Sequence, residues 1–197
     1  MAKVKRIFSD DYLFRGKYVA MVNDLTTEID PHSGATIFNS AVELYLTAAI
    51  VGAHYQLTAN PDNTGDSKRI MASQFSNHYN DLKFAYQLVM LNADRDELSA
   101  VDRVNNAFRY SEADPEYPKN VATFERYMLG GLVFLHNRFI KSTNTHYEDY
   151  RISMDELIAD MSGKKSENND EKYDRFRSGR SHRSRTKDYS GIKIREP

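Results

Sequence analysis

The chain contains 197 residues, with 27 basic side chains, 28 acidic side chains and no cysteine. Without cysteine, neither a disulfide framework nor a zinc–thiolate site is possible, and we expect a protein of the reducing cytoplasm. The small net charge hides an uneven distribution, because residues 1–163 carry 16 Lys and Arg against 22 Asp and Glu, whereas residues 164–197 carry 11 against 6.

The apolar segments do not fit a membrane span or an export signal. The basic N-terminus continues into Ser9-Asp10-Asp11 rather than into an apolar core. The most apolar stretch, residues 41–53, is shorter than the roughly 20 residues that span a bilayer. We therefore predict no membrane association.

The first half of the chain contains one strong helix signal. Residues 11–25 allow a helix, whereas residues 4–8 fit a lone edge strand. Ser40 and Glu43 then fit a capping box, which predicts a helix from residue 41 to about 57. Apolar residues surround most of this helix, so we expect it to be the buried central helix. The turn formers of residues 58–65 predict an exposed loop.

Three further helices are expected at about residues 66–91, 97–110 and 120–141, because apolar residues recur there at three- and four-residue steps. The second of these helices carries one apolar stripe, formed by Leu98, Val101, Val104 and Phe108.

Two local signals complete the body. Each glycine of the Gly130-Gly131 pair would lower the stability of an exposed helix by about 1 kcal/mol, so the pair indicates a kink or the close approach of another backbone. Ser153 and Glu156 form a second possible capping box, which would open a short helix to about residue 161. We predict an all-α bundle of five or six helices over residues 1–162.

Residues 163–197 are predicted to be a disordered basic tail, because they contain too few large aliphatic residues to form a core. Six cations occur there within thirteen residues without an acidic side chain, and they are the candidate nucleic-acid-binding residues: Arg175, Arg177, Arg180, Arg183, Arg185 and Lys187. Guanidinium groups neutralise phosphates, and nearby tyrosines can stack on unpaired bases. An acidic protein partner, or no specific role, is the alternative for this segment.

The histidines do not form a recognisable metal site or catalytic site. None of them belongs to a two-His motif, so we assign no metal, cofactor or catalytic residue. His54 and His136 fall on apolar helices and are expected to bond a carbonyl. Helical nucleases pair Arg with His across about four to six residues, whereas seven residues separate Arg138 from His146.

These patterns favour a non-enzymatic accessory or interaction protein. Its helical body would contact protein partners, and its tail would bind DNA or RNA. One alternative is a phosphate-handling enzyme such as a helical nuclease, using Arg138 with His136 or His146. Another alternative is a structural homo-oligomer, which an exposed apolar stripe on the 120–141 helix would support.

Overall fold

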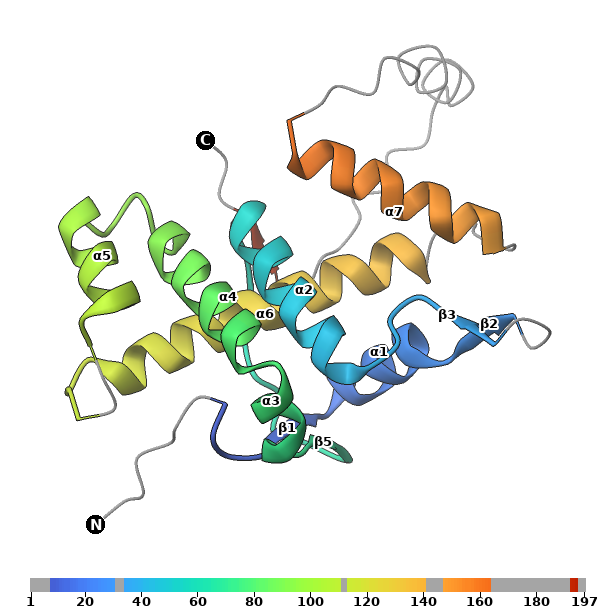
Figure 1. The fold of residues 1–197 in the computed structure, drawn as a ribbon, viewed down its shortest axis with the longest axis horizontal. Helices are drawn as coiled ribbons and strands as arrows, with labels where there is room; N and C mark the ends of the chain where they lie inside the picture. The colour runs from blue at the N-terminus through green and yellow to red at the C-terminus, as the bar shows by residue number, and fades with distance from the viewer. Residues whose placement is uncertain (1–7, 31–33, 111–112, 141–146, 164–191, 195–197) are drawn as a thin grey trace. The chain divides into compact units, whose positions relative to one another are not determined.

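The computed structural model describes residues 8–30, 34–110, 113–140, 147–163 and 192–194 (Figure 1). Contacts divide the chain into two compact units, Met1–Thr143 with Gly191–Pro197, and Asn144–Ser190. The described residues form seven helices and six short strands. The prediction of a helical protein is confirmed in this coarse form, but the expectation of an all-α body is wrong because small sheets accompany the helices.

The elements of the first unit are short and closely spaced. Its helices are α1 (Lys17–Thr26), α2 (Ala41–His54), α3 (Ala72–Asn77), α4 (Tyr79–Asn92), α5 (Ala100–Phe108) and α6 (Tyr117–Phe139). Its strands form three antiparallel pairs, β1 (Tyr12–Arg15) with β5 (Ser67–Ile70), β2 (Glu28–Asp30) with β3 (Ala35–Thr36), and β4 (Leu57–Ala59) with β6 (Ile192–Ile194). The described helices include none with the length and apolarity needed to cross a bilayer.

The central element is α2, as the sequence predicts. The Ser40 hydroxyl oxygen accepts a hydrogen bond of 3.2 Å from the Glu43 N–H, which caps the first turn. Eight of the 14 residues of α2 are buried. Its most extensive contact among the described elements is with α6.

Glycines allow α2 and α6 to approach each other closely. A Cβ atom at Gly131 would lie 1.9 Å from the Ala48 carbonyl oxygen, and one at Gly52 would lie 1.9 Å from the Tyr127 carbonyl oxygen. Gly130 faces β4 instead, where a Cβ atom would lie 2.3 Å from the carbonyl oxygen of Leu57. The close backbone approach predicted from Gly130-Gly131 is therefore confirmed, with a different neighbour for each glycine.

An aromatic cluster fills the core between the N-terminal segment, α2, α3 and α6. The Phe8 ring meets the rings of Tyr45, Phe75 and Phe124 edge-on, at centroid distances of 5.8–6.4 Å. Tyr12 adds a further edge contact to Tyr45 at 5.0 Å. These five side chains are at most 7% exposed. Edge-to-face packing of this kind stabilises a core beyond simple area burial.

Two predicted helices are shorter than expected, because strands occupy their first residues. The segment 11–25 divides into β1 and α1 at Gly16, whose φ of 55° suits glycine. The segment 66–91 divides into β5, α3 and α4. Tyr12 and Ile70 pair across β1 and β5, so these strands depend on a partner far away in the sequence. Residues 4–7 of the possible edge strand lie outside the described residues.

The C-terminal segment contributes one described element to the first unit. Leu57 pairs with Ile194 and Ala59 with Ile192, which makes β6 the antiparallel neighbour of β4. Three residues of the tail predicted to be disordered are thus in a strand, and residues 164–191 and 195–197 lie outside the described part.

The second unit contains the described helix α7 (Tyr147–Met161). The sequence places a capping box at Ser153, but that residue lies inside the helix, which begins six residues earlier. The predicted end at Met161 is confirmed.

Candidate functional site

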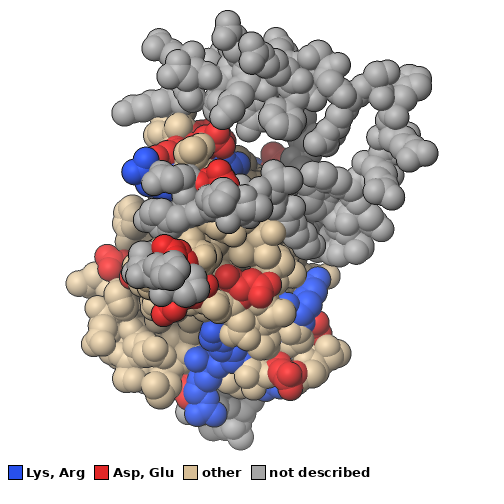
Figure 2. Space-filling view, turned by 90° about the vertical axis from the view of Figure 1, so that its right-hand side faces the viewer, with Lys and Arg blue, Asp and Glu red and all other residues tan. Residues whose placement is uncertain are grey.

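Several of the residues singled out from the sequence are not described. The six tail cations, Arg175 to Lys187, lie outside the described residues, and so does His146. On the face of the molecule drawn in Figure 2, a run of Lys and Arg side chains lies in the lower part, with Asp and Glu side chains beside it.

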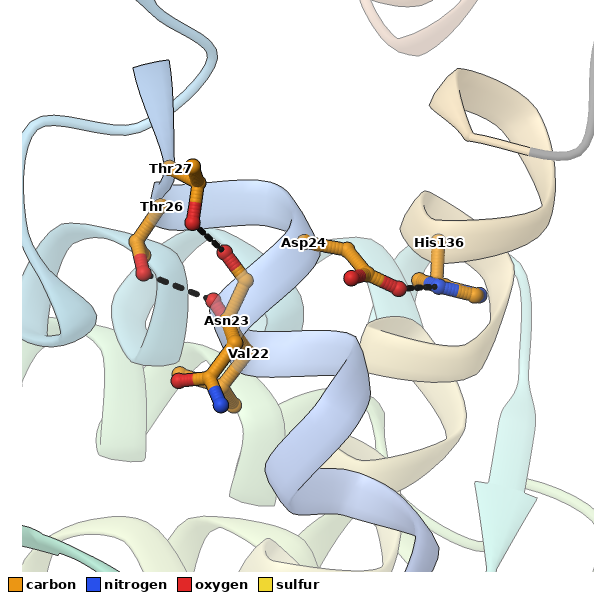
Figure 3. Close-up of polar contacts among 6 residues, drawn as sticks. All are labelled: Val22, Asn23, Asp24, Thr26, Thr27 and His136. Atoms are coloured by element: carbon orange, nitrogen blue, oxygen red, sulfur yellow. Dashed lines mark hydrogen bonds and ion pairs between the residues drawn. The ribbon is translucent and has the colours of Figure 1, made fainter. Parts of the chain in front are cut away.

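The buried His136 on α6 pairs with the carboxylate of Asp24, which is exposed. Its Nε2 atom lies 2.8 Å from Asp24 Oδ2 on α1, and its Nδ1 atom is buried without a hydrogen-bond partner among the described residues (Figure 3). The expected carbonyl partner is thus replaced by a carboxylate. His54 is exposed, and its ring meets Tyr55 edge-on at 4.7 Å.

The geometry of α6 does not favour a nuclease pair of His136 with Arg138. Residues two apart on a helix point in different directions, so both side chains cannot face one phosphate from the same stripe. Elsewhere, His78 Nδ1 lies 4.0 Å from Asp81 Oδ2 at the surface. Within the described ranges, no group of three or more His, Asp and Glu side chains is placed to hold a metal ion.

A cleft of about 380 Å³ lies between β1, the 60–63 loop and α6. The Tyr12 hydroxyl donates a hydrogen bond of 3.0 Å to Glu125 Oε1, and the Tyr18 hydroxyl donates one of 2.6 Å to the Asn60 carbonyl oxygen. Burial, together with the Glu125 charge, raises the pKa of Tyr12 and of Tyr45 well above the ordinary value. Burial, followed by the charges of Asp62 and Glu125, raises the pKa of Tyr18 to about 12.

The cleft is built mainly from groups that bind one another. Asp62 accepts hydrogen bonds from the Lys17 N–H, the Thr64 hydroxyl and the Thr64 N–H, and these bonds lower its pKa to about 2. Its carboxylate therefore occupies the N-terminus of α1, where an external anion would otherwise bind. The tyrosines stay neutral at ordinary pH, and the described lining contains no histidine.

The clearest unexplained feature is an exposed apolar surface on α4 and α5. It consists of Phe84, Val101, Val104 and Phe108, which are 62%, 68%, 45% and 57% exposed. We call these four residues the α4–α5 surface. Helix α5 buries only Ala107, so its apolar stripe faces solvent rather than the core.

The two helices run antiparallel with a defined alignment. The Tyr86 hydroxyl donates a hydrogen bond of 3.4 Å to the Asn106 carbonyl oxygen, which places these residues side by side. Counted from this bond at about 1.5 Å per residue, Phe84 and Phe108 fall at the same end of the helix pair, which we call the open end. Val101 lies near the turn that joins the helices, and Val104 lies between.

The sequence identifies the stripe but not its exposure. The spacing of Val101, Val104 and Phe108 predicts one helical face, and such faces usually pack on the core. For a structural oligomer, the sequence favours the apolar stripe of the 120–141 helix rather than the stripe of α5. In the structure α6 buries 13 of its 23 residues, so the exposed stripe lies on α5.

Comparison of the chain with protein-family models, curated proteins and solved structures finds no match in any of the three.

Proposed function

We propose that this is a non-enzymatic accessory protein that docks onto protein through its α4–α5 surface and binds nucleic acid through its basic tail. The observation that carries the first part is the exposure of two phenylalanines and two valines on one pair of helices. Aromatic and aliphatic side chains gathered on a surface are typical of the centres of protein interfaces. Their burial against a partner supplies the main favourable free energy of docking.

The tail part of the proposal is supported by charge. No acidic residue lies between Arg175 and Lys187, and the face of the body drawn in Figure 2 carries both basic and acidic side chains. Arginine binds phosphate oxygens in a bidentate manner, so a run of arginines suits DNA or RNA better than most anions.

The docking part is tested by protein capture with a surface variant. Phe84→Glu should abolish the capture of protein partners, including other copies of the chain, because it places a charge within the apolar contact. Ile158→Glu is the matched control, since Ile158 is 58% exposed on a different helix. Equal capture by both variants and the unchanged chain would refute this function for the α4–α5 surface.

The tail part is tested by changing charge without shortening the chain. Replacing the six cations with glutamine retains β6, which a truncation at residue 164 would remove. If the tail binds duplex DNA, the unchanged chain should show a salt dependence no steeper than about −5 in a log–log plot, from roughly 0.9 per phosphate. The glutamine variant should lose most of its affinity. Equal affinity of the two proteins would contradict the proposal.

A further inference from the structure

We propose that the α4–α5 surface is covered by the α4–α5 surface of a second copy of this chain, turned antiparallel about a two-fold axis. The inference rests on the proposed docking function and names its occupant. Two antiparallel helices with one exposed apolar face are half of a four-helix bundle. A two-fold axis completes such a bundle with the same surface on both sides.

Side-chain size along the surface suits the antiparallel arrangement. The open end carries two large rings, Phe84 and Phe108, whereas the turn end carries Val101 beside the exposed Ala100. Turning the second copy end over end places its two rings over the smaller residues of the first copy. Large against small is the arrangement that lets facing layers interdigitate. A parallel copy would instead place four rings at one end and leave the other end thinly filled.

Charge along the same two helices points the same way. From residue 93 to 103, the turn end carries four acidic and two basic residues, among them the exposed Asp96 and Asp102. At the open end, residues 79–84 and 108–110 carry one acidic and two basic residues, and both Lys83 and Arg109 are exposed. Beyond α5, Asp114 and Glu116 add two acidic residues, and Glu116 is paired with Lys119 at 2.9 Å.

The antiparallel copy therefore brings the acidic turn end of one chain over the exposed Lys83 and Arg109 of the other. A parallel copy would oppose acidic with acidic and basic with basic. Opposite charges at the rim of an apolar contact favour one orientation and penalise the wrong one.

Engineered cysteines test both the occupant and the orientation, because the chain has no cysteine of its own. Val104 lies midway along the stripe, so Val104→Cys should form a disulfide with itself across the two-fold axis under mild oxidation. Phe108→Cys should not cross-link with itself. It should cross-link when mixed with Val101→Cys, because these positions face each other only in the antiparallel arrangement. Circular dichroism melts of each variant check that the fold is retained.

Sedimentation of the unchanged chain, with charge reversal, gives an independent test. The chain should be dimeric at high concentration, and Asp96→Lys should raise the dissociation constant by on the order of tenfold. Adding Arg109→Glu to the same chain should restore most of the affinity, since the reversed charges again face each other.

Two outcomes would overturn the proposal. Self-cross-linking of Phe108→Cys, with or without that of Val104→Cys, would refute the antiparallel arrangement. A chain that stays monomeric at every concentration, with no cross-linking, would refute the second copy as occupant. If such a monomer still captured another protein in a Phe84-dependent manner, the proposed docking function would stand while this inference failed. If Phe84→Glu changed no protein contact at all, both would fail.

Discussion

Substitution of Gly131 by alanine should separate the two central helices. The added methyl carbon would lie 1.9 Å from the Ala48 carbonyl oxygen and 2.7 Å from the Gly52 nitrogen. Both neighbours are backbone atoms of α2, so no side chain can rotate to make room. Because Cβ atoms essentially never come closer than 3.0 Å to such neighbours, α2 and α6 must move apart locally by about 1 Å.

Two opposing effects set the size of the change. Alanine is a better helix former than glycine by about 1 kcal/mol, which would stabilise α6. Overpacking of a close contact costs about 1–3 kcal/mol and sometimes more. Since the contact lies within the most extensive helix pair, we place the cost at the upper end and expect a net loss of about 2 kcal/mol in the free energy of unfolding. For a chain of this size, the melting temperature should fall by about 4–8 °C.

Thermal and urea unfolding followed by circular dichroism measure this loss. Ala122→Gly is the matched control, because Ala122 is exposed on the same helix and its substitution reports propensity alone, at about 1 kcal/mol. Gly52→Ala should behave like Gly131→Ala, since its methyl carbon would lie 1.9 Å from the Tyr127 carbonyl oxygen. A Gly131→Ala protein as stable as the unchanged chain, or more stable, would refute the close contact.

Three further predictions concern polar groups in the core. Tyr127→Phe should lower the free energy of unfolding by about 1–3 kcal/mol in urea titrations, because the Tyr127 hydroxyl oxygen accepts a 3.0 Å hydrogen bond from the Asp94 N–H; no change would contradict this bond. His136→Leu should lower the free energy of unfolding by about 1–3 kcal/mol in the same titrations, because it removes the 2.8 Å contact of Nε2 with Asp24 Oδ2; an unchanged stability would show that this contact contributes nothing. Burial raises the pKa of Tyr18 and of Tyr86 to about 12, so between pH 10 and 12 the unfolded chain loses protons that the folded chain keeps. Stability should therefore fall as pH rises through this window, by up to about 1.4 kcal/mol per pH unit per tyrosine and by about half of that where water screens the hydroxyl; a flat profile in denaturant titrations would contradict the shifts.

The sequence predicts the helices whose local signals agree with their tertiary role. Ser40 caps α2 and apolar residues surround that helix, so propensity and burial give the same answer. Gly130-Gly131 is also readable from sequence, because two glycines in a helix require a packing reason. The sequence does not predict that α2 and β4 contact this pair, because the local pattern of α6 contains no information about its neighbours.

The strands are missed for a physical reason. The four residues of β5 are too few to show alternation, and apolar residues of the following helices extend their periodicity across it. The strand exists because Tyr12 and Ile70 pair and both side chains are buried. Likewise, β6 ends three residues before the C-terminus, and it forms because it pairs with β4.

The spacing of apolar residues on α5 defines a stripe but cannot say what covers it. In the folded chain α5 faces the core through Ala107, and the stripe stays in water. A candidate docking surface is thus recognised only when periodicity and burial are compared and found to disagree.

The free energy of burying the α4–α5 surface indicates how much charge would matter to the proposed dimer. Full burial of a large apolar side chain is worth about 1.5–3 kcal/mol, and the four residues of the α4–α5 surface are roughly half exposed. Two copies together would then recover about 6–12 kcal/mol, which is close to the estimated 4–15 kcal/mol lost as the partners give up their freedom of motion. Apolar burial alone leaves little surplus. In the proposed dimer, the opposed charges of Asp96 and Arg109 would therefore help to set the orientation and the affinity, and such a dimer should dissociate on dilution and in high salt.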